Sequence, residues 1–207
     1  LITTTKHYIQ NKYKKDGFYK STVEIKTEPA EEGKSQNMII NSDKGSKVRI
    51  SSIDFEGNSQ ITDAKLKKAM KESKVRSILN PMRIFKSSKF IEKNYKTDLV
   101  SVIDKYKENG YRDARIVDEK VVYNPKNNRV DIDLKLEEGN KYYMGNIRFI
   151  GNTLYTDSYL RRILGIQKGE VYNGVLLQKR VQDVTNPDAQ DITNLYQNNG
   201  YLFSQVH

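Results

Sequence analysis

The sequence predicts an α+β fold made of tandem copies of one unit, in which a strand is followed by two helices and then by two more strands. Two repeated phrases carry this prediction. The phrase YKENGY at 106–111 has counterparts at 13–18 and 196–201, at spacings of 93 and 90 residues. The phrase IDFEGN at 53–58 recurs as IRFIGN at 147–152, an offset of 94 residues. Self-similarity at a nearly constant spacing of this length is typical of repeat proteins.

The complete unit is expected over 47–141, and it opens with a strand and a helix. Alternating apolar residues predict the strand over 47–57, and apolar residues at helical spacing predict the helix over 63–72. A basic and aromatic connection follows at 73–96. It could contact phosphates or lipid headgroups, but we favour a loop whose apolar residues tuck under the domain while its lysine stems stay in water.

The second helix of this unit is expected to begin at an N-cap supplied by Thr97 or Asp98 and to end at Gly110. Its apolar stripe consists of Leu99, Val102, Ile103 and Tyr106. These positions follow the spacing of three and four residues that places side chains on one face of a helix. The helix therefore has one face available to cover a sheet.

A hairpin of two strands completes the unit. The strands are expected over 114–123 and 129–138, joined by a turn at 124–128. In the second strand the inward-facing residues are Val130, Ile132, Leu134 and Leu136. Since the residues between them are polar, one face of the sheet is buried and the other is wet. A three-stranded mixed sheet with two helices on one face satisfies this order.

Incomplete units are expected on both sides of the complete one. Residues 1–46 read as the C-terminal part of a unit, with the end of a helix over 1–17 and strands over 21–28 and 37–42. Residues 142–207 read as the N-terminal part of a further unit. Its expected elements are helices near 157–164 and 175–184, a helix from Asn186–Asp188 to Gly200, and a strand beginning at Phe203. No signal peptide is apparent, and we expect an internal piece of a longer protein.

Composition narrows the classes of function. The chain has no cysteine and a net charge of +10, and it contains no apolar run long enough for a transmembrane helix. No phosphate loop and no metalloprotease motif occurs, and His7 and His207 lie at opposite ends of the chain. The carboxylate pairs 118–119, 131–133 and 137–138 are interpreted as solvated faces. We therefore expect no enzyme activity, no cofactor and no metal.

The repeated phrases resemble POTRA domains, which are βααββ units arranged head to tail. The resemblance rests on the strand ends at 53–58 and 147–152, on the helix ends at 106–111 and 196–201, and on the Glu-Gly-x-x-Tyr junction at 138–142. Among POTRA proteins the chain is similar to the BamA family of outer-membrane protein assembly factors. The resemblance implies that the chain is an internal fragment of such a protein, without the β-barrel. KGEVYNGVLL (168–177) and DITNLYQNNGYLFSQV (191–206) carry this likeness.

This resemblance implies a periplasmic location on the Gram-negative outer membrane, and a binding and scaffold role. The implied partners are unfolded outer-membrane proteins, accessory subunits such as lipoproteins, and the adjoining β-barrel of the full-length protein. Binding is expected by β-strand augmentation, in which an extended partner segment pairs with a sheet edge. No nucleic-acid partner is expected.

The binding residues implied in this way lie on the first hairpin strand, for which Ser21–Glu28 is the counterpart in the first unit. The candidate edge residues are Arg115, Ile116, Val117, Asp118, Glu119 and Val121. The candidate groove helix contributes Val102, Ile103 and Tyr106. The turns are assigned a structural role at Gly57, Asn58, Gly110, Gly151, Asn152 and Gly200.

Two other interpretations are open. The first is a set of POTRA domains from a related outer-membrane secretion or translocation transporter, which only the adjoining sequence would distinguish. The second belongs to another class, a basic αβ repeat protein that binds RNA. It predicts an affinity that falls steeply with salt. The aromatic residues argue against it, because they fall at helix ends and expected core positions and form no stacking platform.

Overall fold

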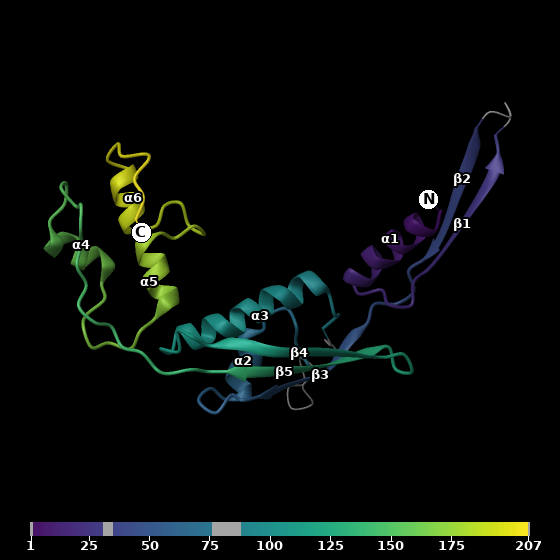
Figure 1. Ribbon diagram of the computed structural model, residues 1–207, viewed down its shortest axis with the longest axis horizontal. Coiled ribbons are helices and arrows are strands. Elements are labelled where there is room, and N and C mark those ends of the chain that lie inside the picture. Colours follow the sequence, from purple (N-terminus) through teal and green to yellow (C-terminus); the bar gives the residue numbers. More distant parts are fainter. Residues whose placement is uncertain (1, 31–34, 76–87, 207) are drawn as a thin grey trace. The chain divides into compact units, whose positions relative to one another are not determined.

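The structure is a computed structural model that describes residues 2–30, 35–75 and 88–206 (Figure 1). By their contacts the described residues divide into two compact bodies. The first body runs up to Glu56 and includes Thr62–Ser101 and Val117–Lys135. The second body comprises Gly57–Ile61, Val102–Ile116 and the chain from Leu136 onwards. In chain order the elements are α1 (Ile2–Lys15), β1 (Thr22–Pro29), β2 (Gln36–Asp43), β3 (Arg49–Glu56), α2 (Asp63–Ala69), α3 (Glu92–Lys107), β4 (Arg115–Asn124), β5 (Arg129–Glu137), α4 (Asp157–Leu164), α5 (Gly174–Val181) and α6 (Ile192–Gln197).

The central sheet has three strands in the order β3-β5-β4. β3 pairs in parallel with β5, so that Ile53 lies opposite Ile132 and Phe55 opposite Leu134. The register shifts by one residue between Ile50 and Ser52, which is a β-bulge. β4 precedes β5 through a short turn and pairs with it as a hairpin. The α+β class and the mixed sheet are therefore as predicted from the sequence.

One face of this sheet is buried, as the alternation in β5 predicts. Val130, Ile132, Leu134 and Leu136 have at most 4% of their surface exposed, whereas Asp133 and Lys135 between them are exposed. Leu66 of α2 and Tyr95, Val102 and Tyr106 of α3 are buried as well. Each fully buried aliphatic side chain contributes about 1.5–3 kcal/mol. Burial of these alternating apolar side chains is thus the main source of stability for the three-stranded sheet and the helices that cover it.

Helix α3 begins earlier than predicted. It starts at Glu92, so the prediction of an N-cap at Thr97 or Asp98 is wrong. Asp98 instead lies inside the helix and is buried, and its carboxylate accepts hydrogen bonds from the backbone N–H of Glu72 at 3.2 Å and of Ser73 at 2.6 Å. The apolar stripe continues backwards to Tyr95, which packs on the Phe90 ring with 5.4 Å between centroids. This contact stabilises the first turns of the helix.

The N-terminal elements match the prediction within a few residues. Helix α1 precedes the β1–β2 pair, which is antiparallel with Ile25 opposite Ile40. Val23 of β1 is buried, while α1 has no buried residue and every residue of β2 is exposed. The two strands form a ribbon that extends from the turn after α1 (Figure 1).

The C-terminal region 142–206 folds around three helices. Leu160, Leu164, Ile166 and Ile192 form its buried cluster. The last helix was predicted to start at Asn186–Asp188, but α6 starts at Ile192 because the side chain of Asp191 caps it, accepting from the backbone N–H of Asn194 at 2.7 Å. Asn186 forms a turn instead, accepting from the N–H of Asp188 at 3.2 Å.

Two expected strands are absent from the described part of this region. No strand forms at 147–151, and the strand predicted from Phe203 is not found over 203–206. In the complete unit the first strand, β3, pairs with β5. Among the described residues no strand lies beside either segment, so the backbone groups of these segments join no ladder.

Candidate functional site

Strand β4 lies at an edge of the three-stranded sheet. Within the described parts of the chain it pairs with β5 alone, so one side of its backbone carries donors and acceptors that no other strand takes up. The strand is ten residues long, which is long for an edge. A run of backbone groups of this length is a template for pairing with another extended segment.

The opposite edge, β3, is partly covered by a neighbouring segment. The backbone N–H of Ile50 donates to the carbonyl of Ser88 at 3.1 Å, and the N–H of Phe90 donates to the carbonyl of Val48 at 2.9 Å. Arg49 and Lys89 also form an isolated antiparallel bridge. The start of β3 therefore already has a backbone partner, and β4 is the more accessible of the two edges.

The surface of β4 combines charged and apolar side chains. Arg115, Val117, Asp118 and Glu119 are exposed, whereas Ile116 and Val121 are half-buried. Lys120 forms an ion pair with Asp118 at 3.5 Å, and Arg115 pairs with Glu137 of β5. Charged residues on an edge strand discourage uncontrolled aggregation. The strand is thus protected by its charges without being blocked along its backbone.

Val122 is an exposed apolar residue of β4 that the sequence reasoning did not select. It is 55% exposed, whereas the selected Val121 is half-buried. Where two valines are adjacent, the alternation of apolar residues does not predict which of the two faces water. Together with Val117, which is 40% exposed, Val122 gives the edge two apolar contact points.

Of the three candidate binding residues on the predicted groove helix, one is accessible to a partner. Val102 and Tyr106 of α3 are fully buried, so they belong to the core and present no surface to a partner. Ile103 is half-buried and is the one of the three that another chain can reach. Burial of the apolar stripe is what its helical spacing demands, since the same face cannot serve the core and a ligand.

The turn residues adopt the backbone conformations for which they were selected. Gly57, Gly110, Gly151 and Gly200 have φ values of 86°, 97°, 81° and 92°, in the left-handed region that glycine adopts most readily. Asn58 donates from its side chain to the carbonyl of Ile61 at 3.0 Å. Asn152 makes the same bond to the carbonyl of Tyr155, also at 3.0 Å.

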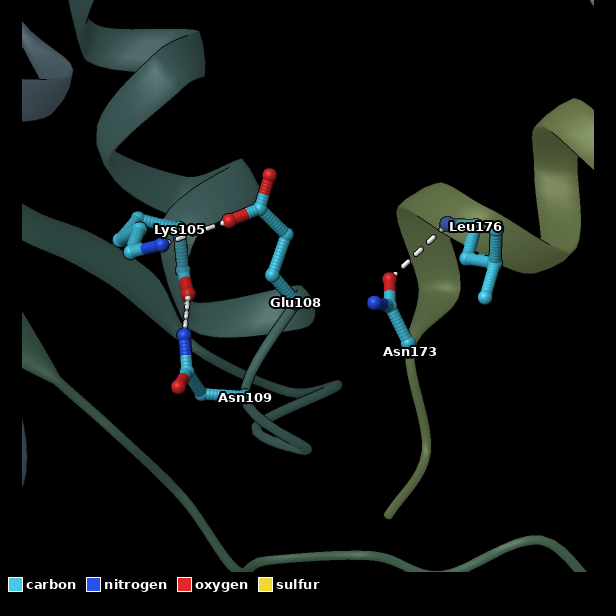
Figure 2. Close-up of polar contacts among 5 residues, drawn as sticks. All are labelled: Lys105, Glu108, Asn109, Asn173 and Leu176. Carbon is cyan, nitrogen blue, oxygen red and sulfur yellow. Dashed lines mark hydrogen bonds and ion pairs between the residues drawn. The ribbon is translucent and has the colours of Figure 1, made fainter. Parts of the chain in front are cut away.

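The end of α3 has its own polar closure (Figure 2). The side-chain amide of Asn109 donates to the carbonyl of Lys105 at 2.7 Å, and Lys105 forms an ion pair with Glu108 at 2.8 Å. The same figure shows Asn173, whose side chain accepts from the N–H of Leu176 at 2.9 Å and caps the start of α5. These local bonds define where each helix ends and begins.

Glu138 is a buried carboxylate that the sequence reasoning placed on a solvated face, and that interpretation is wrong. It is 8% exposed and accepts from the Ser59 hydroxyl at 2.7 Å and from the backbone N–H of Gln60 at 2.9 Å. The N–H of Ile61 donates to it as well, at 3.4 Å. Burial by itself raises the pKa of Glu138, but the hydrogen bonds from Ser59, Gln60 and Ile61 outweigh it and hold the pKa below its ordinary value.

No cluster suited to a metal ion occurs in the described parts of the chain, where no group of three or more His, Asp or Glu residues converges. His7 is exposed on α1, and His207 lies outside the described residues. Half of the basic connection 73–96, residues 76–87, also lies outside them. Of its described end, Phe90 is buried. Across the described helices, none is both long enough and apolar enough to cross a membrane.

The architecture by itself defines the class of protein, a repeat protein built from βααββ modules. A strand, two helices and a hairpin that close into a mixed three-stranded sheet form a βααββ module, and the repeated phrases show that the module recurs. The model of the POTRA family, described as surface antigen variable number repeat, matches residues 48–139 and 142–207. The chain belongs to this family.

Two of the proteins to which the chain is similar are outer membrane protein assembly factors. The outer membrane protein assembly factor BamA of Nitratidesulfovibrio vulgaris is 24% identical over 197 residues, covering 94% of this chain and 24% of that protein. BamA of Neisseria meningitidis serogroup B is 27% identical over 170 residues, covering 81% of this chain and 20% of that protein. The chain thus spans about a quarter or less of the length of these relatives.

A solved structure shares the fold. The crystal structure of Haemophilus influenzae BamA POTRA3-5 superposes with a TM-score of 0.50 at 21% identity. The match covers 85% of this chain and 65% of the other. At this identity the likeness concerns the fold alone, and it agrees with the α+β modules described above.

Proposed function

We propose that this chain is a periplasmic binding and scaffold region of an outer-membrane protein assembly factor, and that it acts without enzymatic chemistry. The relatives above are named for outer membrane protein assembly, and the chain shares their POTRA repeats. Its partners are unfolded outer-membrane proteins, and accessory subunits such as lipoproteins. The location is the periplasmic side of a Gram-negative outer membrane.

The observation that carries the proposal is the open edge of β4. The opposite edge is engaged by Ser88 and Phe90, whereas within the described parts of the chain β4 has β5 as its single strand neighbour. An extended segment can add to β4 through backbone hydrogen bonds, and exposed Val117 and Val122 add apolar contacts.

This mode of binding suits a partner that varies in sequence. Backbone N–H and C=O groups are the same in every polypeptide, so the pairing energy depends little on which segment is bound. The charges of Asp118, Glu119 and Lys120 limit the strength of pairing and keep the edge from aggregating. Weak, sequence-tolerant binding allows one surface to receive and release many unfolded chains.

A proline scan of β4 tests the proposal. Proline is placed singly at each position from Ala114 to Val122. A photo-crosslinker at Val117 reports binding of an unfolded outer-membrane protein that is diluted from urea. For prolines at or beside position 117, the crosslinker is placed at Val122 instead. In an edge strand the N–H groups point alternately towards the neighbouring strand and away from it. Prolines at outward positions are therefore expected to abolish crosslinking and leave the circular dichroism unchanged.

The control places the crosslinker at Val184, which is 78% exposed and lies outside the sheet. Its crosslinking yield is expected to be low and insensitive to the prolines. If folded variants with outward prolines crosslink as well as the unmodified chain, edge pairing is wrong. Crosslinking to purified accessory lipoproteins in the same variants then tests whether those subunits use the same edge.

A further inference from the structure

The glycine that ends each long helix accepts a hydrogen bond from the segment that opens the following unit. The carbonyl of Gly17 accepts from the N–H of Val48 at 2.8 Å, and the carbonyl of Gly110 accepts from the N–H of Tyr142, also at 2.8 Å. The two glycines are 93 residues apart and their two donors 94 residues apart. The same backbone contact thus occurs twice, once at the start of each POTRA segment.

A second pair of backbone contacts repeats around the first. The carbonyl of Val48 accepts from the N–H of Phe90 at 2.9 Å, and the carbonyl of Tyr142 accepts from the N–H of Tyr172 at 3.0 Å. The antiparallel bridge Arg49–Lys89 likewise has a counterpart in Tyr143–Val171. At each place, a segment that follows the first helix of the unit pairs with the opening segment and so closes over the glycine.

The absence of a side chain is required at both glycines. A Cβ on Gly17 would lie 2.2 Å from the carbonyl oxygen of Phe90. A Cβ on Gly110 would lie 2.9 Å from Cγ1 of Val171 and 3.1 Å from the carbonyl oxygen of Tyr142. Both glycines are buried, and both have a φ in the left-handed region. Any side chain would therefore push these neighbouring segments away from the helix end.

The aromatic residues of the repeated phrase hold this glycine in place. Tyr106 and Tyr111 meet edge to face with centroids 6.0 Å apart, and the N–H of Tyr111 donates to the carbonyl of Tyr106 at 3.0 Å. Tyr13 and Phe18 repeat the arrangement at 6.4 Å. The rings brace the chain reversal, so that the glycine carbonyl points out from the helix end.

We propose that this helix-ending glycine is a joint that couples each POTRA unit to the next. Its carbonyl accepts from the backbone N–H of the opening segment, and its missing side chain lets that segment and the one beside it pack closely. The partner surface is thus the opening segment of the following unit, bound through its backbone. The coupling depends on one glycine at each junction and is separate from the β4 edge.

Side chains around the second joint add a polar clamp. The Tyr142 hydroxyl donates to the Asp113 carboxylate at 2.6 Å, and the Arg112 guanidinium lies 4.6 Å from the centre of the Tyr142 ring. The hydrogen bond from Tyr142, with that from Arg112, holds the pKa of Asp113 below its usual value. At the first joint aromatic contacts take this place, since Tyr19 packs on Phe90 with 6.2 Å between centroids.

Gly110→Ala in the whole 207-residue chain tests the joint, and Gly200→Ala is its matched control. Gly200 ends the third copy of the phrase with a φ of 92°, so alanine imposes the same backbone strain there, but a Cβ on Gly200 meets no described atom within 4 Å. Spin labels are attached to cysteines at Val100 and Gln178, which are exposed on α3 and α5. The chain contains no other cysteine.

Pulsed electron spin resonance then measures the distance distribution between the two labels. Gly110→Ala is expected to broaden the distribution at least twofold, and Gly200→Ala to leave it unchanged. Should Gly110→Ala fail to fold, Tyr142→Pro removes the N–H donor and leaves the glycine intact, with Tyr142→Phe as its control. An unchanged distribution in folded Gly110→Ala or in Tyr142→Pro, or equal broadening in Gly200→Ala, overturns the proposal.

Discussion

The same turn occurs twice in this chain, in surroundings that differ. Gly57-Asn58 ends β3 in the complete unit, and Gly151-Asn152 occupies the equivalent place in the C-terminal region. Their φ values of 86° and 81° agree, and each asparagine makes the same side-chain bond at 3.0 Å. Residues within a few positions of each other are therefore enough to form the turn.

The strand before each turn behaves differently. Residues 49–56 form β3 beside β5, whereas 147–150 form no strand, and Ile150 is 94% exposed. A Cβ on Gly57 would lie 2.2 Å from the carbonyl oxygen of Leu136 in β5, but one on Gly151 meets no described atom within 4 Å. The comparison shows that a turn is local, while a strand depends on a partner that is distant in sequence.

The largest expected effect is on this pair of glycines. Gly57→Ala adds a clash with the backbone of β5 to the strain of a left-handed alanine and should lower the free energy of unfolding by about 2–5 kcal/mol. Gly151→Ala imposes the strain alone and should cost about 1–2 kcal/mol. Hydrogen exchange of the β5 amides, measured for both variants, checks the difference. Equal losses of protection in β5 would mean that the two turns have the same surroundings.

Removal of the Glu138 carboxylate should have the next largest effect. Glu138→Ala leaves the Ser59 hydroxyl and the backbone N–H of Gln60 without their acceptor, which costs about 1.5–3 kcal/mol for hydrogen bonds to a charged group. Urea unfolding followed by circular dichroism measures the loss. Glu137→Ala, at the exposed neighbouring position, is the control and should change stability far less.

The contribution of Glu138 should depend on pH. Because the pKa of Glu138 is lower in the folded protein than in the unfolded chain, its stabilising effect is present above the unfolded pKa and is lost as pH falls through the folded one. The unmodified chain should therefore lose stability below about pH 4.3, the ordinary value for a glutamate. Glu138→Gln should show a shallower loss over that range in urea titrations at successive pH values. Parallel pH profiles for the two proteins would contradict this assignment.

A smaller effect is expected at Asp98, the carboxylate inside α3. Asp98→Ala removes the acceptor of the N–H groups of Glu72 and Ser73 and should cost about 1–3 kcal/mol. Asp191→Ala is the matched change in the C-terminal region, where the carboxylate caps α6 and accepts from the N–H of Asp183 at 2.9 Å. Differential scanning calorimetry on both variants should show each loss in its own region. Loss of the same transition by both would contradict the local role assigned to each carboxylate.

The smallest effect is expected at the ion pair of Lys105 and Glu108 (Figure 2). Both side chains are more than a third exposed, and such surface pairs contribute about 0–0.5 kcal/mol. The third copy of the phrase carries Leu195 and Asn198 at these places and still ends its helix. Glu108→Ala should thus leave the urea midpoint almost unchanged, and a loss above about 1 kcal/mol would indicate a larger role.

The repeated phrases were sufficient to predict the element order of the complete unit, because turns, helix ends and apolar alternation arise from neighbouring residues. The start of α3 was mispredicted for a tertiary reason: Asp98 resembles an N-cap, but its carboxylate accepts from Glu72 and Ser73, in the segment that follows α2. The role of Glu138 was missed for the same reason, since its donors are nearly 80 residues away. The exposure of Val122 also depends on packing that alternation does not show.

The joint at Gly110 has a consequence for how such chains change over generations. Its central bond uses a carbonyl and an amide, which every residue except proline can supply, and the one constrained position is the glycine. A gene segment for one module can therefore be duplicated or deleted, and the new neighbours meet through the same backbone groups. The backbone bond of the joint then requires no coordinated mutation of two side-chain surfaces, and the side-chain contacts around it already differ between the two joints.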